Sequence, residues 1–387
     1  MLHNPHIEKL SQGYLFPEIE KRKQLLAKQN PNANLISLSI GDTSQPIPKP
    51  ICESMSSYIM SMSTVEGYSG YGSAQSCKEL QNSINSKIYN NIIDSDDIFI
   101  SDGSKCDLGR LQIAFGNDVK VAIQNPAYPV YIDSSVILGM TENYDTNLQS
   151  YKNMTSIVCS PENNFLPNLD LITDEDVIFF CHPNNPTGVA YSYEQLEQLV
   201  DCARKKNAII VFDTAYAQFI QSDDIPRSIY EIPHAQEVAI EIGSFSKFAG
   251  FTGLRLGWSI VPKQLPGKIR DNYKRVLSTF FNGASKIVQA GGLACLEENN
   301  WKLLQKNISF YQENARILKT AIEEQGITCF GGSHAPFLWA HFPDHDSWEL
   351  FDIFLKELHL VPIPGEGFGA CGKEFLRLSA FGSREDA

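Results

Sequence analysis

Short apolar runs alternate with longer amphipathic stretches through the middle of the chain, from Val119 to Ser259. A short apolar run bounded by turn residues is typical of a buried strand, and a longer stretch with charges on one face is typical of a helix. The expected strands are 121–124, 156–160, 176–181, 208–212 and 238–242, and a helix is expected over 195–206. This alternation predicts an α/β fold in which helices cover a mostly parallel sheet.

The flanking regions have other patterns. Ahead of the alternating region, helices are expected over 16–29, 50–64 and 77–89, with short strands over 35–40 and 98–101. After it, the sequence predicts a largely helical stretch over 263–325, strands over 337–342 and 375–379, and a helix over 347–357. We therefore expect an N-terminal arm with part of a small domain (1–45), a large α/β domain (46–282) and a small α+β domain (283–387).

Composition limits the kinds of partner and compartment. The 387 residues are 43% hydrophobic, and the formal net charge of -13 argues against nucleic acid or an anionic membrane as the main partner. The 9 cysteines form no CxxC pair and the histidines are dispersed, so neither a metal site nor a disulfide framework is expected. We find no signal core and no run of membrane-spanning length, and so expect a reducing, cytoplasmic compartment.

Candidate chemistry is densest in VAIEIGSFSKFAGFTGLRLGWS (238–259). Lys247 follows a buried strand and could form a Schiff base with the aldehyde of pyridoxal phosphate. Ser244 and Ser246 offer hydroxyl donors to a phosphate, and Arg255 offers a charged fork that suits phosphate oxygens. The alternative is a solvated loop in which the lysine occurs by chance.

Polar residues also follow the other expected strands. Asp213 could sit against a pyridine nitrogen and keep it protonated, although an aspartate after a strand is often a helix cap. Tyr216 and Asn185 could donate to the ring oxygen, and Tyr128, between two prolines, could stack on the ring. For both tyrosines the alternative is packing in the core.

Three further positions are candidates for binding anions. A helix is expected to begin near Ser104, and its N-terminus with Lys105 would suit an anion, unless Ser104 is an ordinary cap. Gly41 lies in a turn that could present its backbone N–H to a carboxylate, and the alternative is a plain turn. Arg377 stands alone among apolar neighbours in FLRLSAF, where it could bind a substrate carboxylate or form an internal salt bridge.

Five motifs occur along the chain in the order NPAYP, NNPTG, DTAY, SFSK and GLRLGW. With these motifs the chain resembles the fold-type I pyridoxal-phosphate aminotransferases over nearly its whole length. The segments SIGDTSQP, DGSKCDLGRLQ, TFFNGAS, GGSHAPFLW and PGEGFG are most similar to the branch that acts on LL-2,6-diaminopimelate. The resemblance implies a seven-stranded sheet in the large domain and a homodimer with shared active sites. It also implies an exchange between LL-2,6-diaminopimelate plus 2-oxoglutarate and tetrahydrodipicolinate plus glutamate, a step that feeds lysine and peptidoglycan synthesis.

The resemblance further implies roles at matching positions. Lys247 would carry the cofactor and move the proton, with Asp213 and Tyr216 as further catalytic groups. The implied cofactor contacts are Tyr71 (from the partner subunit), Ser104, Lys105, Tyr128, Asn185, Asp213, Tyr216, Ser244, Ser246 and Arg255. The implied substrate contacts are Tyr14, Gly41, Lys105, Tyr128, Asn185, Asn282 (across the dimer interface) and Arg377.

The sequence departs from the family pattern in one place. After Tyr71 the chain reads GYGSAQS, so Ala74 takes the place of an acidic residue that would help bind the distal amino group, and Ser76 replaces a glycine. Glu66 is a nearby acid that could compensate. A broader aspartate or aromatic aminotransferase, or a β-lyase with the same cofactor, therefore remains an alternative. A cofactor-binding regulator would need a DNA-binding module, and the chain has neither a spare domain nor a basic patch.

Overall fold

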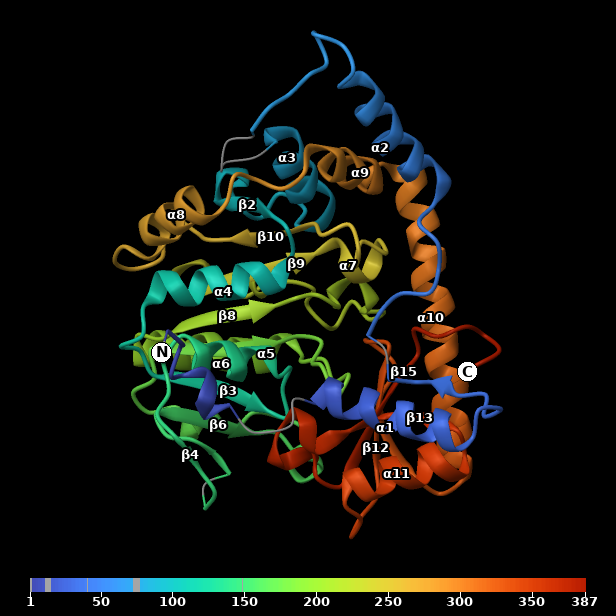
Figure 1. The fold of residues 1–387 in the computed structure, drawn as a ribbon. Helices are drawn as coiled ribbons and strands as arrows, with labels where there is room; N and C mark the ends of the chain where they lie inside the picture. Colours follow the sequence, from blue (N-terminus) through green and yellow to red (C-terminus); the bar gives the residue numbers. More distant parts are fainter. Residues whose placement is uncertain (1, 11–14, 40, 72–76, 148) are drawn as a thin grey trace.

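The computed structural model describes residues 2–10, 15–39, 41–71, 77–147 and 149–387. In this part of the chain, a seven-stranded sheet has the strand order β2-β10-β9-β8-β7-β3-β6 (Figure 1). Its strands are β2 Ile98–Ser101, β3 Val121–Asn125, β6 Met154–Val158, β7 Val177–Cys181, β8 Ile209–Asp213, β9 Ala239–Ser244 and β10 Gly257–Ile260. Neighbouring strands pair in parallel except β10, which is antiparallel to both β2 and β9. The mostly parallel sheet that the sequence predicts is confirmed.

Both faces of this sheet are buried, and successive residues of each strand enter different cores. In β7, Val177, Phe179 and Cys181 face one core, and Ile178 and Phe180 face the other. The first core is closed by α4 Ser104–Phe115, α5 Val130–Ile137 and α8 Ile269–Phe280. The second is closed by α3 Lys78–Ile88, α6 Tyr193–Lys206 and α9 Lys286–Leu296, with α2 Lys49–Ser61 packed on α9. Burial on both faces explains why the strands read as continuous apolar runs.

A smaller antiparallel sheet lies beside the large one, with the order β11-β12-β15-β14 (Figure 1). Its strands are β11 Thr328–Gly331, β12 Phe337–His341, β14 Ile363–Pro364 and β15 Phe375–Ser379. Residues of α1 Leu15–Gln29 and α11 Ser347–Glu357 share a core with this sheet. The 27-residue helix α10 Glu298–Glu324 contributes to the large core with its first half and to the small sheet with its second. The two sheets therefore share one long helix.

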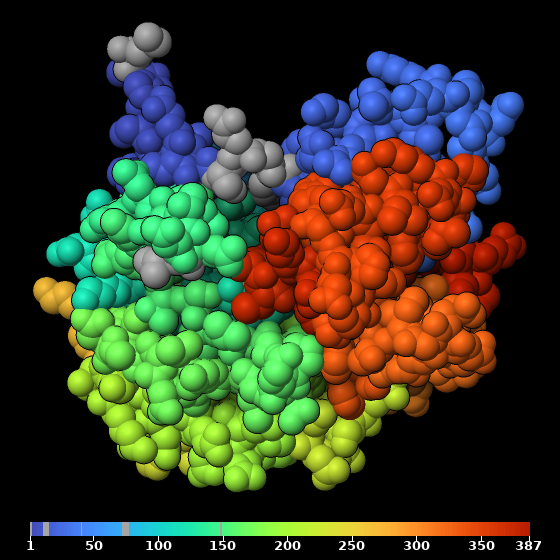
Figure 2. All heavy atoms as spheres, turned by 90° about the horizontal axis from the view of Figure 1, so that it is seen from below, coloured from blue at the N-terminus to red at the C-terminus, as the bar shows by residue number. Residues whose placement is uncertain are grey.

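The N-terminal segment packs on the C-terminal part of the chain. The strand β1 Ile36–Ser37 pairs in parallel with β13 Leu360–Val361. Figure 2 shows N-terminal residues (blue) lying against the C-terminal region (orange to red) on one side of the molecule. The division into 1–45, 46–282 and 283–387 stays a prediction. None of the helices in the described ranges combines the length and apolar character needed to span a membrane.

Some elements differ from the sequence prediction. The expected strand 35–40 is only two residues long, and the strand expected at 156–160 begins and ends two residues earlier. The strand β10, the helix α5 and the short pair β4 Tyr144–Asp145 and β5 Ser150–Tyr151 were not predicted. In β10 the polar Ser259 is fully buried because Tyr273 Oη bonds to its hydroxyl at 3.1 Å. A buried polar residue interrupts the apolar run by which a buried strand is recognised in the sequence, and its hydrogen-bond partner cannot be read from the neighbouring residues.

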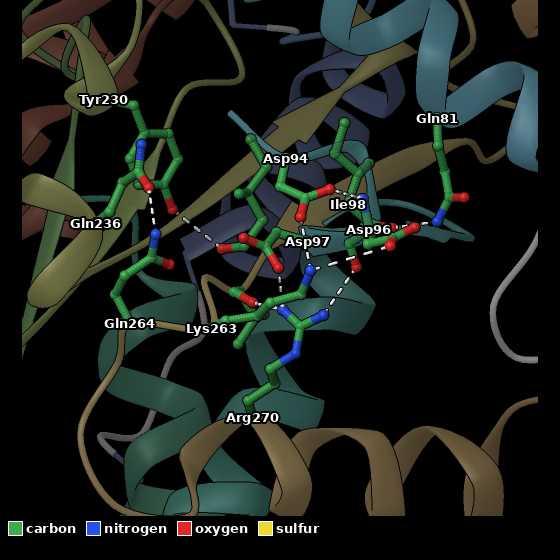
Figure 3. A network of polar contacts seen from close by, with 12 residues as sticks. Gln81, Asp94, Asp96, Asp97, Ile98, Tyr230, Gln236, Lys263, Gln264 and Arg270 are labelled. Atoms are coloured by element: carbon green, nitrogen blue, oxygen red, sulfur yellow. Dashed lines mark hydrogen bonds and ion pairs between the residues drawn. The ribbon is translucent and has the colours of Figure 1, made fainter. Parts of the chain in front are cut away.

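An ion-pair network lies at the edge of the large sheet, beside the start of the edge strand β2 (Figure 3). Arg270 donates to Asp97 Oδ1 at 2.6 Å and to the backbone oxygen of Asp96 at 2.8 Å. Its guanidinium also lies 5.2 Å from the ring of Phe99. Asp97 is 3% exposed, and burial raises the pKa of its carboxyl although Arg270 opposes the rise. Lys263 pairs with Asp94 at 2.6 Å nearby, but both side chains are half exposed.

We expect Arg270→Met to lower the free energy of unfolding by about 3 kcal/mol, because it leaves the carboxylate of Asp97 buried without its partner. The folded-state pKa of Asp97 should rise further, so the loss should be present at neutral pH and disappear as the pH falls below about 4. Urea unfolding at several pH values measures both effects. The matched control is Lys263→Met, which breaks the exposed pair and should change stability little. Equal losses in the two variants would contradict this account.

Candidate active site

A cavity of about 550 Å³ opens at the carboxyl ends of the parallel strands. Open α/β sheets bind ligands at this edge, because the loops that follow the strands converge there. Segments from β7, β8, β9, α4, β15 and the N-terminal arm contribute to its walls. Its lining includes Gly41, Ser104, Lys105, Tyr128, Asn185, Asp213, Tyr216, Ser244, Ser246, Lys247, Arg255 and Arg377. The structure thus brings together candidates that are up to 336 positions apart in the sequence (41 to 377).

Lys247 lies in the single-turn helix α7 Phe245–Phe248, directly after β9. Its Nζ donates to the backbone oxygen of Gly41 and lies 5.8 Å from the ring of Phe381. The pKa of the lysine is lowered to about 8, mainly by burial; Asp42 opposes the lowering, and the positive charges of Arg377 and Arg255 contribute to it. The cavity therefore contains an amine that is partly neutral near physiological pH.

The N-terminus of α4 forms one wall of an anion site. No side chain caps this helix, whose Ncap residue is Gly103 with φ 115°. A Cβ atom on Gly103 would lie 2.3 Å from Nη2 of Arg255, so only glycine allows this close approach. The hydroxyl of Ser104 donates to the backbone oxygen of Gly243 at 3.2 Å, which anchors α4 to β9. The first turn of α4 and a guanidinium thus face the same space.

The end of β9 and the loop after it carry further donors. Ser244 Oγ accepts from the backbone N–H of Ser246 at 3.0 Å, and Arg255 lies 3.4 Å from Ser246 Oγ and donates to Thr252 O at 3.0 Å. Within the described residues, neither Arg255 nor Lys105 forms an ion pair. Hydroxyl, amide and cationic donors without a carboxylate form a donor set that suits a phosphate group.

Asp213 ends β8 and is held by two hydrogen bonds. Tyr131 Oη donates to its Oδ2 at 2.8 Å, and the N–H of Ala215 donates to its Oδ1 at 3.0 Å. Burial raises the pKa of Asp213, and the hydrogen bond from Tyr131 counteracts this. The sequence analysis missed Tyr131. The available signal was its position three residues after Tyr128, since the two rings pack edge to face at 5.7 Å.

Two tyrosines form apolar parts of the wall. Tyr128 lies in the cavity, its ring 5.8 Å from Lys105 Nζ, and burial raises the pKa of its phenol to about 12. Tyr216 packs edge to face on Phe337 at 5.0 Å. Both phenols therefore stay protonated at neutral pH, because burial raises the pKa of each, and each has a hydroxyl that could donate to a ligand.

Arg377 projects from β15 and is 3% exposed. It donates from Nη1 to Asn185 Oδ1 at 2.7 Å and from Nη2 to Ser39 O at 2.8 Å, and its Nε has no partner among the described residues. The rings of Phe337 and Phe368 lie 4.4 Å and 4.9 Å from the guanidinium carbon. Burial lowers the pKa of Arg377 to about 10. The alternative of an internal salt bridge is not found in the described part of the chain, so the charge is available for a ligand carboxylate.

Two predicted residues do not line the cavity of this single chain. Tyr71 is 90% exposed and Asn282 is also exposed, and neither contributes to the wall. Tyr14, Ala74 and Ser76 lie outside the described residues. The described residues contain no group of three or more His, Cys, Asp or Glu side chains arranged to hold a metal ion.

Comparisons with known proteins agree with this geometry. The family model for aminotransferase class I and II matches residues 33–387. The LL-diaminopimelate aminotransferase of Protochlamydia amoebophila (strain UWE25) is 50% identical over 99% of this chain and 94% of its own length. The chloroplastic enzyme of that name from Arabidopsis thaliana is 48% identical over 99% of this chain and 84% of its own length.

Solved structures give the same result for the fold. The L,L-diaminopimelate aminotransferase from Chlamydomonas reinhardtii superposes with a TM-score of 0.95 at 48% identity, covering 100% of this chain and 96% of that one. The aspartate aminotransferase from Thermotoga maritima has a TM-score of 0.84 at 22% identity, covering 99% and 96%. At 22% identity, the similarity to the Thermotoga maritima structure shows only a shared fold.

We expect Lys247 to react with an acylating reagent with a midpoint near pH 8, because its lowered pKa leaves more neutral amine at that pH than an exposed lysine, which titrates near about 10.4. Mass spectrometry of the peptide that contains Lys247 measures the reactivity across pH. Asp42→Asn removes the carboxylate that opposes the lowering, so it should move the midpoint to lower pH. A midpoint close to that of exposed lysines would contradict the proposed environment.

Proposed function

The chain belongs to the class I and II aminotransferases, and we propose that it transfers an amino group between LL-2,6-diaminopimelate and 2-oxoglutarate with pyridoxal phosphate as cofactor. The observation that carries the proposal is the placement of an unpaired buried guanidinium, Arg377, in one cavity with the amine of Lys247. A buried cation that has only neutral partners suits the α-carboxylate of an amino acid. The names of the relatives at 48–50% identity support diaminopimelate as that amino acid.

The donor set of the cavity fits pyridoxal phosphate. Hydroxyl and cationic groups at the first turn of α4 suit the phosphate, while Asp213 lines the same cavity, where its carboxylate could face a ring nitrogen. The residues that would hold the phosphate are Ser104, Lys105, Ser244, Ser246 and Arg255. Those that would hold the ring are Tyr128, Asn185, Asp213 and Tyr216.

When bound, the cofactor supplies an aldehyde carbon for the amino group and a ring that takes up the electron pair of the substrate Cα. Lys247 would attach the cofactor and, once released as a free amine, would accept the proton of the substrate Cα at Nζ. Its low pKa favours this role, because a neutral amine is required. Asp213 would stabilise a protonated nitrogen with its carboxylate, and Tyr131 holds that carboxylate in place.

Arg377 would orient the substrate. Its two Nη atoms already bond to Asn185 and Ser39, which fixes the plane of the guanidinium, and its Nε remains without a partner among the described residues. The α-carboxylate can then bind at the side facing the cavity, with the backbone of Gly41 nearby. After transfer the keto acid from LL-2,6-diaminopimelate would cyclise to tetrahydrodipicolinate, and glutamate would be the second product.

We also propose a homodimer with shared active sites, in the cytoplasm. Tyr71 and Asn282 would then complete the cavity of the partner, and Tyr14 would contact substrate. Support comes from the exposure of large apolar side chains close to Tyr71, among them Val65 at 91% and Tyr68 at 68%. The 9 cysteines are all free, which suits a reducing compartment. The division into domains at residues 45 and 282 belongs to the same proposal.

A broader amino-acid aminotransferase is the second candidate. Ala74 favours it, because the distal amino group of diaminopimelate would lack one acidic contact. A β-lyase is separated from both by its products, since it releases ammonia and pyruvate without consuming an oxo acid.

We expect LL-2,6-diaminopimelate alone to convert the bound cofactor to its amino form, seen as a change in visible absorption, while meso-diaminopimelate, aspartate and tyrosine do not. Because meso-diaminopimelate and the common L-amino acids share the configuration of the reacting Cα atom, this selection must come from contacts with the distal amino-acid group. Lys247→Ala, which removes the amine, should show neither covalent attachment nor turnover. Conversion by several common amino acids would discard the narrow specificity, and Ala74→Glu would then be the variant expected to restore it.

We expect Arg377→Lys to raise the KM values for the amino acid and the oxo acid by about 100-fold, because an ammonium cannot provide the two-pronged contact and leaves Asn185 without its donor. The affinity for pyridoxal phosphate should change much less, since Arg377 is assigned to substrate and reaches the cofactor only through Asn185. Steady-state kinetics and a cofactor titration measure the two quantities. Arg316→Lys is the matched control, because that arginine is exposed on α10. Unchanged KM values would remove Arg377 from the substrate site.

A further inference from the structure

An ion pair directly behind the anion site has no role in the chemistry described so far. Arg110, in α4, donates from Nη1 to Asp102 Oδ1 at 2.6 Å and from Nη2 to Asp102 Oδ2 at 3.0 Å. Its side chain is 12% exposed, and neither residue lines the cavity. The Asp102 side chain is 36% exposed, but a two-pronged pair with a largely buried guanidinium has a more defined geometry than most surface ion pairs.

The guanidinium is fixed by two further contacts. Nη1 lies 3.4 Å from Oδ1 of Asp107, a fully buried carboxylate that also accepts from Tyr273 at 3.0 Å. The ring of Phe281 lies 4.1 Å from the guanidinium carbon. Arg110 is therefore held by side chains from α4 and from the end of α8, and it holds Asp102 in turn.

Asp102 lies next to the N-terminus of α4, where its charge can affect anion binding. It immediately precedes Gly103, the Ncap residue of α4, so its carboxylate lies within one residue of the helix N-terminus that forms the anion site. An aspartate in this region readily bonds to the free N–H groups of a helix and is attracted by its positive end. Here no side chain caps α4. A free Asp102 would compete with a phosphate for these N–H groups and would repel its negative charge.

We propose that Arg110 is a positioning residue that binds Asp102 and keeps its carboxylate away from the anion site at the start of α4. Both oxygens of Asp102 accept from Arg110, which fixes the carboxylate in an orientation in which it does not cap the helix. The pair also neutralises the charge of Asp102 close to the position of the phosphate. The inference rests on the proposed function only in taking a phosphate as the anion.

Affinity for phosphate in four variants tests this idea. In protein freed of cofactor, Arg110→Ala should raise the Kd values of pyridoxal phosphate and of inorganic phosphate about tenfold, the size expected for one nearby charge. Asp102→Asn should weaken neither affinity, because it removes the negative charge that Arg110 holds. The double variant Arg110→Ala/Asp102→Asn should recover most of the lost affinity, because the released side chain no longer carries a charge. Arg275→Ala, an exposed arginine on α8, is the matched control.

Recovery in the double variant distinguishes the proposed role from a purely structural one. If Arg110 only supported the turn, Asp102→Asn would weaken binding as much as Arg110→Ala, and the double variant would bind no better; either result overturns the proposal. An unchanged Kd in Arg110→Ala overturns it as well. If Arg110→Ala does not fold, Arg110→Lys takes its place, because it retains the charge but loses one of the two hydrogen bonds to Asp102. This variant should raise the Kd for phosphate about threefold, and adding Asp102→Asn should reverse the rise. An unchanged Kd in Arg110→Lys would contradict the proposal. Phosphate binding does not depend on which amino acid is the substrate, so this test and that of the proposed function can fail separately.

Discussion

The guanidinium of Arg377 is 3% exposed, and its hydrogen-bond acceptors are an amide oxygen and a backbone oxygen, neither of which carries a charge. Burying a cation without an anion is costly, and the cost shows in its pKa, which burial lowers to about 10. Other interactions of the fold must offset the free energy of burying this cation. These interactions come from two strongly buried sheets, one of which positions Asn185 while the other positions Arg377. The packing of the two sheets therefore holds the guanidinium of Arg377 where it can bind an anionic ligand.

Three segments that are distant in sequence meet at Arg377, because this buried cation needs hydrogen-bond acceptors. Ser39 belongs to the N-terminal arm, Asn185 follows a strand of the large sheet, and Arg377 lies in the small sheet. Pairing of β1 with β13 brings the N-terminal arm to the small sheet, and α10 joins that sheet to the large core. A displacement of any of these elements would remove an acceptor from a buried cation. The substrate end of the cavity is for this reason sensitive to packing far from the chemistry.

Local pattern predicted much of this arrangement. The strands β2 and β15 and the helix α11 have the bounds that the sequence predicts, because each is a short periodic segment with clear turn residues at its ends. Lys247, Asp213 and Asn185 could be proposed because each directly follows an apolar strand, and such positions converge in a parallel sheet. Tyr131 was missed, since its function depends on a hydrogen bond to a residue 82 positions away. Tyr71 and Asn282 could be proposed only from resemblance, because nothing local shows which surface a second chain would cover.

The charges of the cavity act on the amine as well as on the ligands. Arg377 and Arg255 both lower the pKa of Lys247, and both are cations without an acidic partner among the described residues. An anion bound at either guanidinium cancels part of that positive potential. The pKa of Lys247 must then rise, so the amine becomes a stronger base when the anion sites are filled. Before ligands bind, the lowered pKa increases the neutral fraction of the amine, which can attack an aldehyde; after they bind, each neutral amine is a stronger base toward a proton on carbon. One set of fixed charges thus serves both requirements, although the chain as a whole carries a net charge of -13.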